Sequence, residues 1–391
     1  MLRFAVISEC SPFDRKGLFN AVHNRVRHLI DAGECEIDAY CIHSRDTAFT
    51  RRVRHTPVVP STDEVEIEGI RYRILWYDFS IIDHVLVNKL YRKPLFFERF
   101  MSETSAMLKD YDCIMAHSFT GALFASEASR LYGIPYFVTW HGSDIHTHPW
   151  RNPLVLRETE RIMRDAECNF FVSHALMADS DRIASDVRKE VLYNGVSEAF
   201  VRYPDNERER LRSHYGLSEG EKVVAFAGSI VAVKNVKTLQ PIFHEIRSGY
   251  EAKLKFWIIG DGKLREPVEK ALISDDTIDV NLWGNVPSEE MPSMLNCVDV
   301  LLLPSLNEGL GMICAEALKC GAAVAGSDTG GIPEVIGHEN TVPLDDDFVR
   351  NMALKAVEML KNGSEQQVPE TLDWKTTAAL EMNYVKSMIS R

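Results

Sequence analysis

Two glutamates in the second half of the chain stand in a setting suited to a phosphorylated ligand. Glu308 lies in a glycine-bearing loop, and Glu316 follows eight residues later in a segment predicted to be helical. A helix N-terminus reached through glycines presents free N–H groups and the positive end of a dipole, which favours phosphate. Carboxylates beside that phosphate can accept hydrogen bonds from hydroxyls. The spacing therefore indicates a ligand with hydroxyls on both sides of a phosphate, as in a nucleotide-sugar.

The simpler interpretation of these residues is a surface turn flanked by two solvated acids. Taken singly, each residue fits that interpretation better. The apolar run at 298–304 favours the ligand site, because such runs are typical of buried parallel strands and ligands bind beyond their carboxyl ends. We therefore predict that Gly309, Leu310 and Gly311 form the ligand-binding loop together with the two glutamates.

Three further strand ends in the second half carry glycines and polar residues that suit a phosphorylated ligand. The predicted ligand-binding residues there are Gly228, Ser229, Lys234, Gly262, Asn285 and Val286. A lysine at a helix start can neutralise a diphosphate, and glycine lets the backbone approach a ligand closely. For Lys234 alone, a solvated first-turn side chain is an equal alternative. Three successive strand ends that all carry glycine favour the ligand site.

The first half offers two candidate segments. His141 directly follows an apolar strand ending at Trp140, and Lys16 and Gly17 connect the first strand to the first helix. A histidine at a strand end can contact a ligand or simply cap the strand. Arg15 and Lys16 supply positive charge that phosphate or an acceptor can meet.

Strand-like apolar runs alternate with amphipathic helical patterns along the whole chain, which predicts two doubly wound α/β domains with parallel sheets. One long helical pattern is predicted over 83–108. The predicted strands span 3–8, 37–42, 71–77, 113–117, 136–140, 169–172, 222–227, 255–259, 280–283, 298–303 and 322–325.

Turn signals and a charged run at 194–220 place the domain boundary there. We predict an N-terminal domain over 1–196 and a C-terminal domain over 197–373, for which the family resemblance given below implies an acceptor-side role and a nucleotide-sugar-binding role, respectively. A final helix is expected over 374–391, and the cleft between such domains is a common place for ligands.

Composition narrows the functional classes. The 391 residues carry a net charge of −13, which argues against nucleic-acid binding. None of the eight cysteines forms a Cys-x-x-Cys pair, so we expect reduced core cysteines in a cytosolic protein. The N-terminus has too short an apolar core for a signal peptide, and no apolar run approaches the roughly 20 residues that span a bilayer. The expected location is the cytoplasm, and the inner face of the membrane is a second expected location.

The segment Leu86–Phe100 mixes basic and apolar side chains. Such a mixture can touch an anionic membrane surface. Pro94 interrupts the segment, and packing beside the acceptor cleft is the interpretation that the sequence favours.

Together these residues resemble the retaining nucleotide-sugar glycosyltransferases of family four. The strongest part of the resemblance is Glu308-x7-Glu316, and Gly284-Asn285-Val286 and Thr329-Gly330-Gly331-Ile332-Pro333-Glu334 support it. The resemblance covers nearly the whole chain. It implies the GT-B fold, in which two Rossmann-like, doubly wound parallel-sheet domains face each other across a cleft and the last helix returns to the N-terminal domain.

The resemblance also implies roles for individual residues. Glu308, His141 and Lys234 would be catalytic: Glu308 faces the donor sugar, His141 supports that sugar and Lys234 supports the diphosphate. Glu316 would hold the ribose hydroxyls. The implied reaction moves a sugar from a nucleoside-diphosphate sugar, with UDP or GDP as the nucleotide, to a hydroxyl of a glycan or lipid-linked acceptor. Polysaccharide or glycoconjugate synthesis is the expected setting.

No cofactor or metal is predicted, because no Asp-x-Asp pair stands in a likely strand-end loop. The chain departs from the family at Ser229, where an arginine usually lies beside the diphosphate. We hypothesise that Lys16 or Arg15 partly supplies the missing charge.

Two other functions remain as alternatives. A nucleotide-sugar 2-epimerase or hydrolase on the same fold would share the donor-side residues but need no acceptor. A non-catalytic nucleotide-sugar-binding protein is the second alternative, and Ser229 is the feature that supports it.

Overall fold

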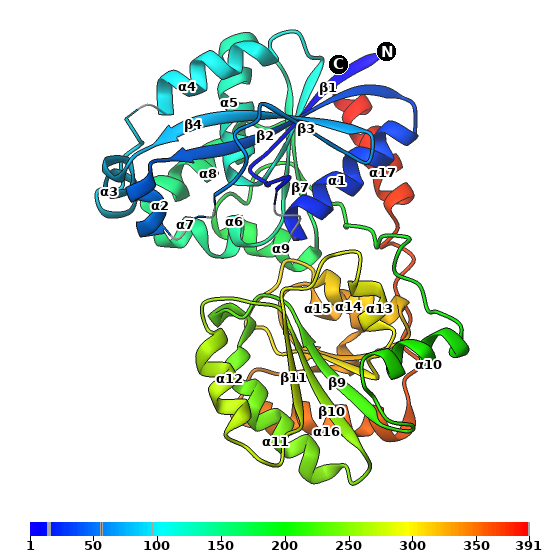
Figure 1. Cartoon of the computed structure of the whole chain (residues 1–391). Coiled ribbons are helices and arrows are strands. Elements are labelled where there is room, and N and C mark those ends of the chain that lie inside the picture. The colour runs from blue at the N-terminus through cyan, green and yellow to red at the C-terminus, as the bar shows by residue number, and fades with distance from the viewer. Residues whose placement is uncertain (14–16, 55, 57, 96, 390–391) are drawn as a thin grey trace. The chain divides into compact units, whose positions relative to one another are not determined.

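A computed structural model describes residues 1–13, 17–54, 56, 58–95 and 97–389 of the chain. The chain divides into two compact units, each with its own sheet and core (Figure 1). Unit 1 comprises Met1–Gly195 and Asp373–Arg391, and unit 2 comprises Val196–Leu372.

Unit 1 is built on an eight-stranded sheet with the order β3-β4-β2-β1-β5-β6-β7-β8. All neighbouring strands are parallel except the pair β3 and β4, which is antiparallel. Central strands such as β5 and β6 are buried along their whole length, as expected for a sheet covered on both faces. The strands are β1 (Leu2–Ser8), β2 (Cys35–Asp46), β3 (Glu64–Ile67), β4 (Ile70–Phe79), β5 (Cys113–His117), β6 (Tyr136–Trp140), β7 (Cys168–Phe171) and β8 (Lys189–Val191).

Helices connect the parallel strands of unit 1. The single helix predicted over 83–108 is wrong: the described residues there form two α-helices and a short 3-10 helix, and Pro94 lies between the two α-helices. Proline lacks an N–H group and disfavours helical geometry in the residue before it. The helices are α1 (Gly17–Asp31), α2 (Ala48–Arg54), α3 (Ile81–Lys89), α4 (Phe97–Ser105), η1 (Ala106–Leu108), α5 (Ser118–Tyr132), α6 (Ser143–His146), α7 (His148–Arg151), α8 (Pro153–Asp165), α9 (His174–Asp179), η2 (Ser180–Arg182) and α17 (Trp374–Ile389).

The last helix, α17, belongs to unit 1 although it follows unit 2 in the sequence. Its side chains Ala378, Met382 and Val385 join the apolar cluster that holds α1 against the sheet. Figure 1 shows α17, in red, beside the blue helix α1. Burial of this apolar face ties the end of the chain to its beginning.

Unit 2 contains a six-stranded sheet with the order β11-β10-β9-β12-β13-β14, in which every neighbouring pair is parallel. Its apolar core is formed by the sheet together with α11, α12 and α16. The strands are β9 (Lys222–Ala227), β10 (Leu254–Ile259), β11 (Val280–Gly284), β12 (Val300–Leu303), β13 (Ala323–Ser327) and β14 (Thr341–Val342). The helices are α10 (Asp205–His214), η3 (Ala232–Lys234), η4 (Val236–Thr238), α11 (Leu239–Gly249), α12 (Arg265–Ile273), α13 (Met291–Leu295), α14 (Met312–Lys319), α15 (Ile332–Ile336), η5 (His338–Asn340) and α16 (Phe348–Asn362).

The predicted architecture of two doubly wound, mainly parallel α/β domains is confirmed. In each unit the strand order reverses beside the first strand: between β1 and β5 in unit 1, and between β9 and β12 in unit 2. The loops that leave the carboxyl ends of two such strands diverge, so that ligands bind at this switch point. Lys234 and Glu308 follow β9 and β12, the two strands at the switch point of unit 2, whereas His141 follows β6 in unit 1.

Candidate active site

Lys234 and Glu308 meet at the switch point of unit 2. Lys234 ends η3, in the connection after β9, and Glu308 lies in the loop after β12. Lys234 Nζ donates a hydrogen bond to Glu308 Oε1, and the buried Ser305 hydroxyl donates to the same oxygen at 2.9 Å. The backbone N–H of Leu306 also donates to the carbonyl of Val233 at 2.8 Å. The two loops are therefore held together by their backbones as well as by an ion pair.

A turn formed by Gly330 and Gly331 after β13 packs against the backbone of Glu308. The N–H of Gly331 donates to the Glu308 carbonyl at 3.2 Å. Gly330 has a φ of +53°, and a Cβ atom there would overlap the same carbonyl oxygen. Only glycine satisfies both conditions. The Gly330-Gly331 pair is thus a positioning element for Glu308, and its signal in the sequence is the double glycine itself.

The loop after Glu308 leads into α14. Gly311 precedes the helix in left-handed conformation, with a φ of +83° and no side-chain cap on the first N–H groups. The side chain of Leu310 is buried in the core, so this residue can offer a ligand only its backbone. The first turn of α14 therefore lacks a side-chain cap and presents the positive dipole end expected of an anion site, with the Cys314 N–H already donating to the Gly311 carbonyl at 2.9 Å.

Glu316 lies in the middle of α14 and is half-buried. Burial raises the pKa of its carboxyl group to about 7. Within the described part of the chain, no side chain or backbone group makes a hydrogen bond or ion pair with this carboxylate. A ligand with hydroxyl groups would supply the missing donors and favour the charged form.

The glycines at the ends of β9 and β10 serve backbone packing. A Cβ atom at Gly260 would overlap the Gly228 carbonyl oxygen, and one at Gly262 would overlap that of Ile230. The N–H of Gly228 donates to the carbonyl of Ile259 at 2.9 Å. These contacts explain why glycine is required at 260 and 262 without a ligand, and a donor contact of Gly262 stays a prediction.

The other candidate residues of unit 2 lie at its surface. Ser229 and Asn285 are exposed, and Val286 is half-buried. Arg265, which follows the β10 loop, is engaged by Glu269 at 2.5 Å and Asp261 at 3.3 Å. It is therefore not a free replacement for the arginine that the family usually has at position 229.

In unit 1, His141 is paired with a second histidine. His117 ends β5 and His141 follows β6, and His117 Nδ1 lies 3.1 Å from His141 Nε2. The backbone N–H of His141 and that of Gly142 donate to the buried carboxylate of Asp144, at 3.2 and 2.8 Å. Sequence reasoning missed His117, because its partner lies 24 residues away and the pairing depends on β5 and β6 being neighbours.

Both histidines are neutral at physiological pH. Burial, with a further contribution from the Arg25 charge, lowers the pKa of His141 to about 3. Burial also moves the pKa of His117 well below its usual value. The ring contact is therefore a hydrogen bond between neutral imidazoles, in which one nitrogen donates and the other accepts.

Arg25 on α1 is a buried cation that sequence reasoning also missed. Its guanidinium donates to Thr139 Oγ1 at 3.2 Å, to Asn194 Oδ1 at 3.2 Å and to Glu381 Oε1 at 3.4 Å. Arg25 and Glu381 each have 1% of the side chain exposed. This network joins α1, β6 and α17 beneath the His141 strand end.

The predicted segment at the end of β1 is only partly described. Gly17 begins α1, and no atom lies within 4 Å of where its Cβ would be. Arg15 and Lys16 lie outside the described residues. The loop end at Glu9 is tied to α5, because Thr120 Oγ1 donates to the Glu9 carboxylate.

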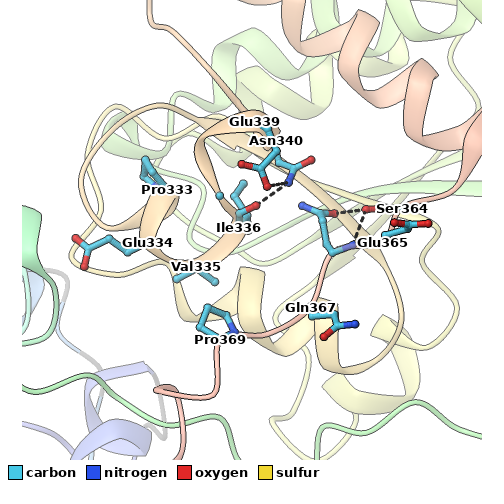
Figure 2. Close-up of a pocket in the computed structure, with 12 residues that line it drawn as sticks. Pro333, Glu334, Val335, Ile336, Glu339, Asn340, Ser364, Glu365, Gln367 and Pro369 are labelled. Atoms are coloured by element: carbon cyan, nitrogen blue, oxygen red, sulfur yellow. Dashed lines mark hydrogen bonds between the residues drawn. The ribbon is translucent and has the colours of Figure 1, made fainter.

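A separate hollow in unit 2, of about 510 Å³, lies between α15 and the segment after α16 (Figure 2). None of the predicted site residues lines it. Asn340 Nδ2 donates to the Ile336 carbonyl at 2.7 Å, and Ser364 Oγ donates to Gln366 at 2.9 Å, so polar groups of the hollow bond to each other. The described residues contain no group of three or more His, Cys, Asp or Glu side chains placed to hold a metal ion.

The fold, the Lys234–Glu308 pair in unit 2 and the His117–His141 pair in unit 1 indicate a class of protein. Comparisons with known families give the same class. A profile described as "Glycosyl transferase 4-like domain" matches residues 20–195, and one described as "Glycosyl transferases group 1" matches residues 207–370. This chain belongs to the glycosyltransferases that these two profiles describe.

Curated relatives match part of the chain. The 2-deoxystreptamine glucosyltransferase of Streptomyces kanamyceticus is 29% identical over 54% of this chain and 57% of its own length. The N-acetyl-alpha-D-glucosaminyl L-malate synthase of Bacillus anthracis is 28% identical over 60% of this chain and 61% of its own length. The chain thus spans somewhat over half the length of these relatives.

Solved structures match over nearly the whole chain. HepE of Anabaena, in complex with UDP and glucose, has a TM-score of 0.68 and 14% identity, over 99% of this chain and 97% of that one. The lipopolysaccharide outer core galactosyltransferase WaaB in apo form has a TM-score of 0.66 and 16% identity, over 99% of both chains. At this identity the likeness concerns the fold, and the predicted GT-B fold is confirmed.

Proposed function

We propose that this glycosyltransferase is a retaining enzyme that moves a sugar from a nucleoside-diphosphate sugar to a hydroxyl of a glycan or lipid-linked acceptor. The observation that carries the proposal is the Lys234–Glu308 pair at the switch point of unit 2, next to the uncapped first turn of α14. The complexes of HepE with UDP and UDP-glucose support a nucleotide-sugar donor. Synthesis of a polysaccharide or other glycoconjugate is the proposed setting.

The proposed sugar transfer requires that the departing diphosphate be stabilised. The bond from the anomeric carbon to the diphosphate oxygen breaks, a bond to the acceptor oxygen forms, and the acceptor proton is released. Lys234 and the first N–H groups of α14 stabilise the negative charge that develops on the diphosphate. Because Lys234 donates a hydrogen bond to Glu308, donor binding must share or replace that hydrogen bond.

The remaining proposed site residues hold the donor in place. Glu308 orients the sugar, and Glu316 accepts hydrogen bonds from the ribose hydroxyls. His141, neutral because of burial, exchanges a hydrogen bond with a sugar hydroxyl. The charge that Ser229 does not supply is provided by Lys16 or Arg15. Since Lys234 and the helix terminus supply positive charge, we propose that transfer needs no metal, which activity in the presence of EDTA would test.

The decisive experiment measures donor consumption with a panel of UDP- and GDP-sugars, with and without candidate acceptors. A transferase consumes donor only with an acceptor and forms a product whose anomeric configuration, read by NMR coupling constants, is that of the donor. Consumption that is equally fast without acceptor would identify a hydrolase or epimerase. Nucleotide binding with no turnover of any donor would identify a binding protein, and an inverted product would contradict retention.

A further inference from the structure

One surface of unit 1 combines exposed apolar side chains with unpaired basic ones. It is formed by α2, α3 and the segment 90–95, and we call it the basic–apolar surface. Helices α2 and α3 are in contact, and Figure 1 shows them together at one end of the unit 1 sheet. Phe49 is 64% exposed and Leu95 is 62% exposed, and Ile82 and Leu90 are exposed as well. Packing beside the acceptor cleft, the role that the sequence favours for Leu86–Phe100, stays a prediction.

The segments that form the basic–apolar surface carry an excess of positive charge. Across residues 47–54 and 80–95 there are six Lys and Arg residues, and the only acidic residue is Asp83. Asp83 is fully buried, so no negative charge in these two segments faces solvent. This local excess of positive charge stands out in a chain whose net charge is −13.

Three of the basic residues have no acidic partner. Arg54 pairs with Asp46 at 2.6 Å, and Lys93 lies 3.7 Å from Glu158 and 3.8 Å from the exposed Glu98. By contrast, Arg52, Lys89 and Arg92 form no ion pair with any acidic side chain in the described ranges of the chain. Their charges remain available for an external anion.

The buried Asp83 gives the surface a defined shape. Its carboxylate accepts hydrogen bonds from the N–H and hydroxyl of Ser80, at 2.9 and 2.5 Å, and from the N–H of Leu95 at 2.8 Å. The last bond folds the segment 90–95 back onto the start of α3. The exposed apolar side chains therefore lie on helices and on a turn that the hydrogen bonds of Asp83 hold in place.

We propose that the basic–apolar surface binds the surface of an anionic lipid bilayer. Amphipathic elements that expose apolar side chains beside lysine and arginine lie in the interface, where apolar groups enter the acyl boundary and the cations meet anionic headgroups. Several large apolar side chains exposed on elements in contact with each other are what an interaction site on a folded protein presents. Among the described residues, no helix is long and apolar enough to cross a membrane, so this contact is peripheral. The inference does not depend on the proposed sugar transfer.

Flotation of the full chain with vesicles tests the proposal. We expect binding to vesicles of phosphatidylcholine with about 30% phosphatidylglycerol, whose negative surface potential attracts basic segments, and little binding to phosphatidylcholine alone. Raising the salt concentration should weaken the binding. The variant Arg52→Glu/Arg92→Glu should bind about 30-fold or more weakly, since each cation near such a surface contributes about a fivefold change.

Matched variants separate apolar insertion from general surface effects. Phe49→Ser/Leu95→Ser should also weaken vesicle binding, whereas Leu354→Ser, at a leucine of unit 2 that is 57% exposed, and Lys361→Glu should not. Circular dichroism checks that each variant folds. Equal binding to neutral vesicles, no loss in either double variant, or an equal loss in the unit 2 controls would overturn the proposal. So would binding to polyglutamate or RNA that exceeds binding to vesicles and is indifferent to Phe49→Ser/Leu95→Ser.

Discussion

Lys234 and Glu308, 74 residues apart in the sequence, are joined by a hydrogen bond where the strand order of unit 2 reverses. One side chain is cationic and the other anionic, and each is suited to a different part of a nucleotide-sugar. Glu308 Oε1 also accepts from Ser305, so two side chains of unit 2 fix its orientation. The predictions that follow begin with this pair.

Replacing the Glu308 carboxylate by an amide should reduce turnover. In Glu308→Gln, the amide oxygen can still accept from Lys234 and Ser305, but the negative charge is lost. We expect kcat to fall about 100-fold, the scale of losing one preorganised electrostatic group, while UDP affinity changes little. Initial rates and calorimetric titration with UDP measure the two effects. Glu358→Gln, at an exposed acid of α16, serves as the control, and full activity of Glu308→Gln would contradict the assigned role.

Glu316→Gln should stabilise the free protein and weaken nucleotide binding. Because burial raises the pKa of Glu316 to about 7, the folded chain holds a proton between pH 4.5 and 7 that the unfolded chain has released. The contribution of this group to stability therefore falls as the pH rises through that window. At pH 8 the variant should gain about 1–3 kcal/mol in unfolding free energy, and less at pH 5. Urea denaturation and UDP titration test this, and unchanged UDP affinity would argue against a ribose contact.

The paired histidines should make unit 1 less stable in acid. The pKa of His141 is lowered to about 3, so below pH 6.5 the unfolded chain takes up a proton that the folded chain does not bind. Stability from this group is complete above pH 6.5 and is lost as the pH falls towards 3, by at most about 1.4 kcal/mol per pH unit. His141→Asn should flatten the pH dependence of urea unfolding, whereas His338→Asn, at an exposed histidine, should not. An equal slope in the wild type and His141→Asn would refute the neutral-imidazole assignment.

A methyl group at Gly330 should disturb Glu308. In Gly330→Ala, the new Cβ overlaps the Glu308 carbonyl oxygen, and alanine must also adopt a positive φ. Gly133→Ala, at the C-terminal end of α5, is the matched control, because its φ is +69° in the left-handed region and its Cβ would meet no atom within 4 Å. We expect the control to lose about 1 kcal/mol of stability with normal activity, and Gly330→Ala to lose more stability together with most of its activity. Equal behaviour of the two variants would show that Gly330 does not position Glu308.

Breaking the buried Arg25–Glu381 pair should destabilise unit 1 more than removing it. Arg25→Met leaves the Glu381 carboxylate uncompensated in the core, at a cost of about 3–5 kcal/mol. The double variant Arg25→Met/Glu381→Met should recover much of that loss. Urea unfolding of the single and double variants gives the coupling energy. Strict additivity would mean that the two side chains do not stabilise each other, although Glu381 Oε1 lies 3.4 Å from Arg25.

Local sequence patterns were sufficient to predict most strands of the two sheets. The strands predicted over 113–117, 136–140 and 222–227 have the observed bounds, because short apolar runs between turn residues admit few other structures. The short strands β3, β8 and β14 were missed, since two to four residues form a strand only when a neighbour pairs with them. The pattern over 83–108 misled because helical periodicity continues across Pro94.

Site residues divide in the same way. Glu308, Lys234 and His141 could be singled out because their types follow the ends of apolar strands. His117 and Arg25 could not, because His117 acquires its partner when β5 pairs with β6, and Arg25 meets Glu381 across 356 residues when α17 packs against α1.

The sequence by itself determined the alternation of strands and helices, the family resemblance and the residue types at the strand ends. Only the tertiary structure decided which of these residues touch, which carboxyl and imidazole groups lose their contact with water, and which apolar side chains remain exposed on α2 and α3. The physical reason is that residue type and spacing act locally. Strand order and burial arise from contacts between segments that are distant in the sequence.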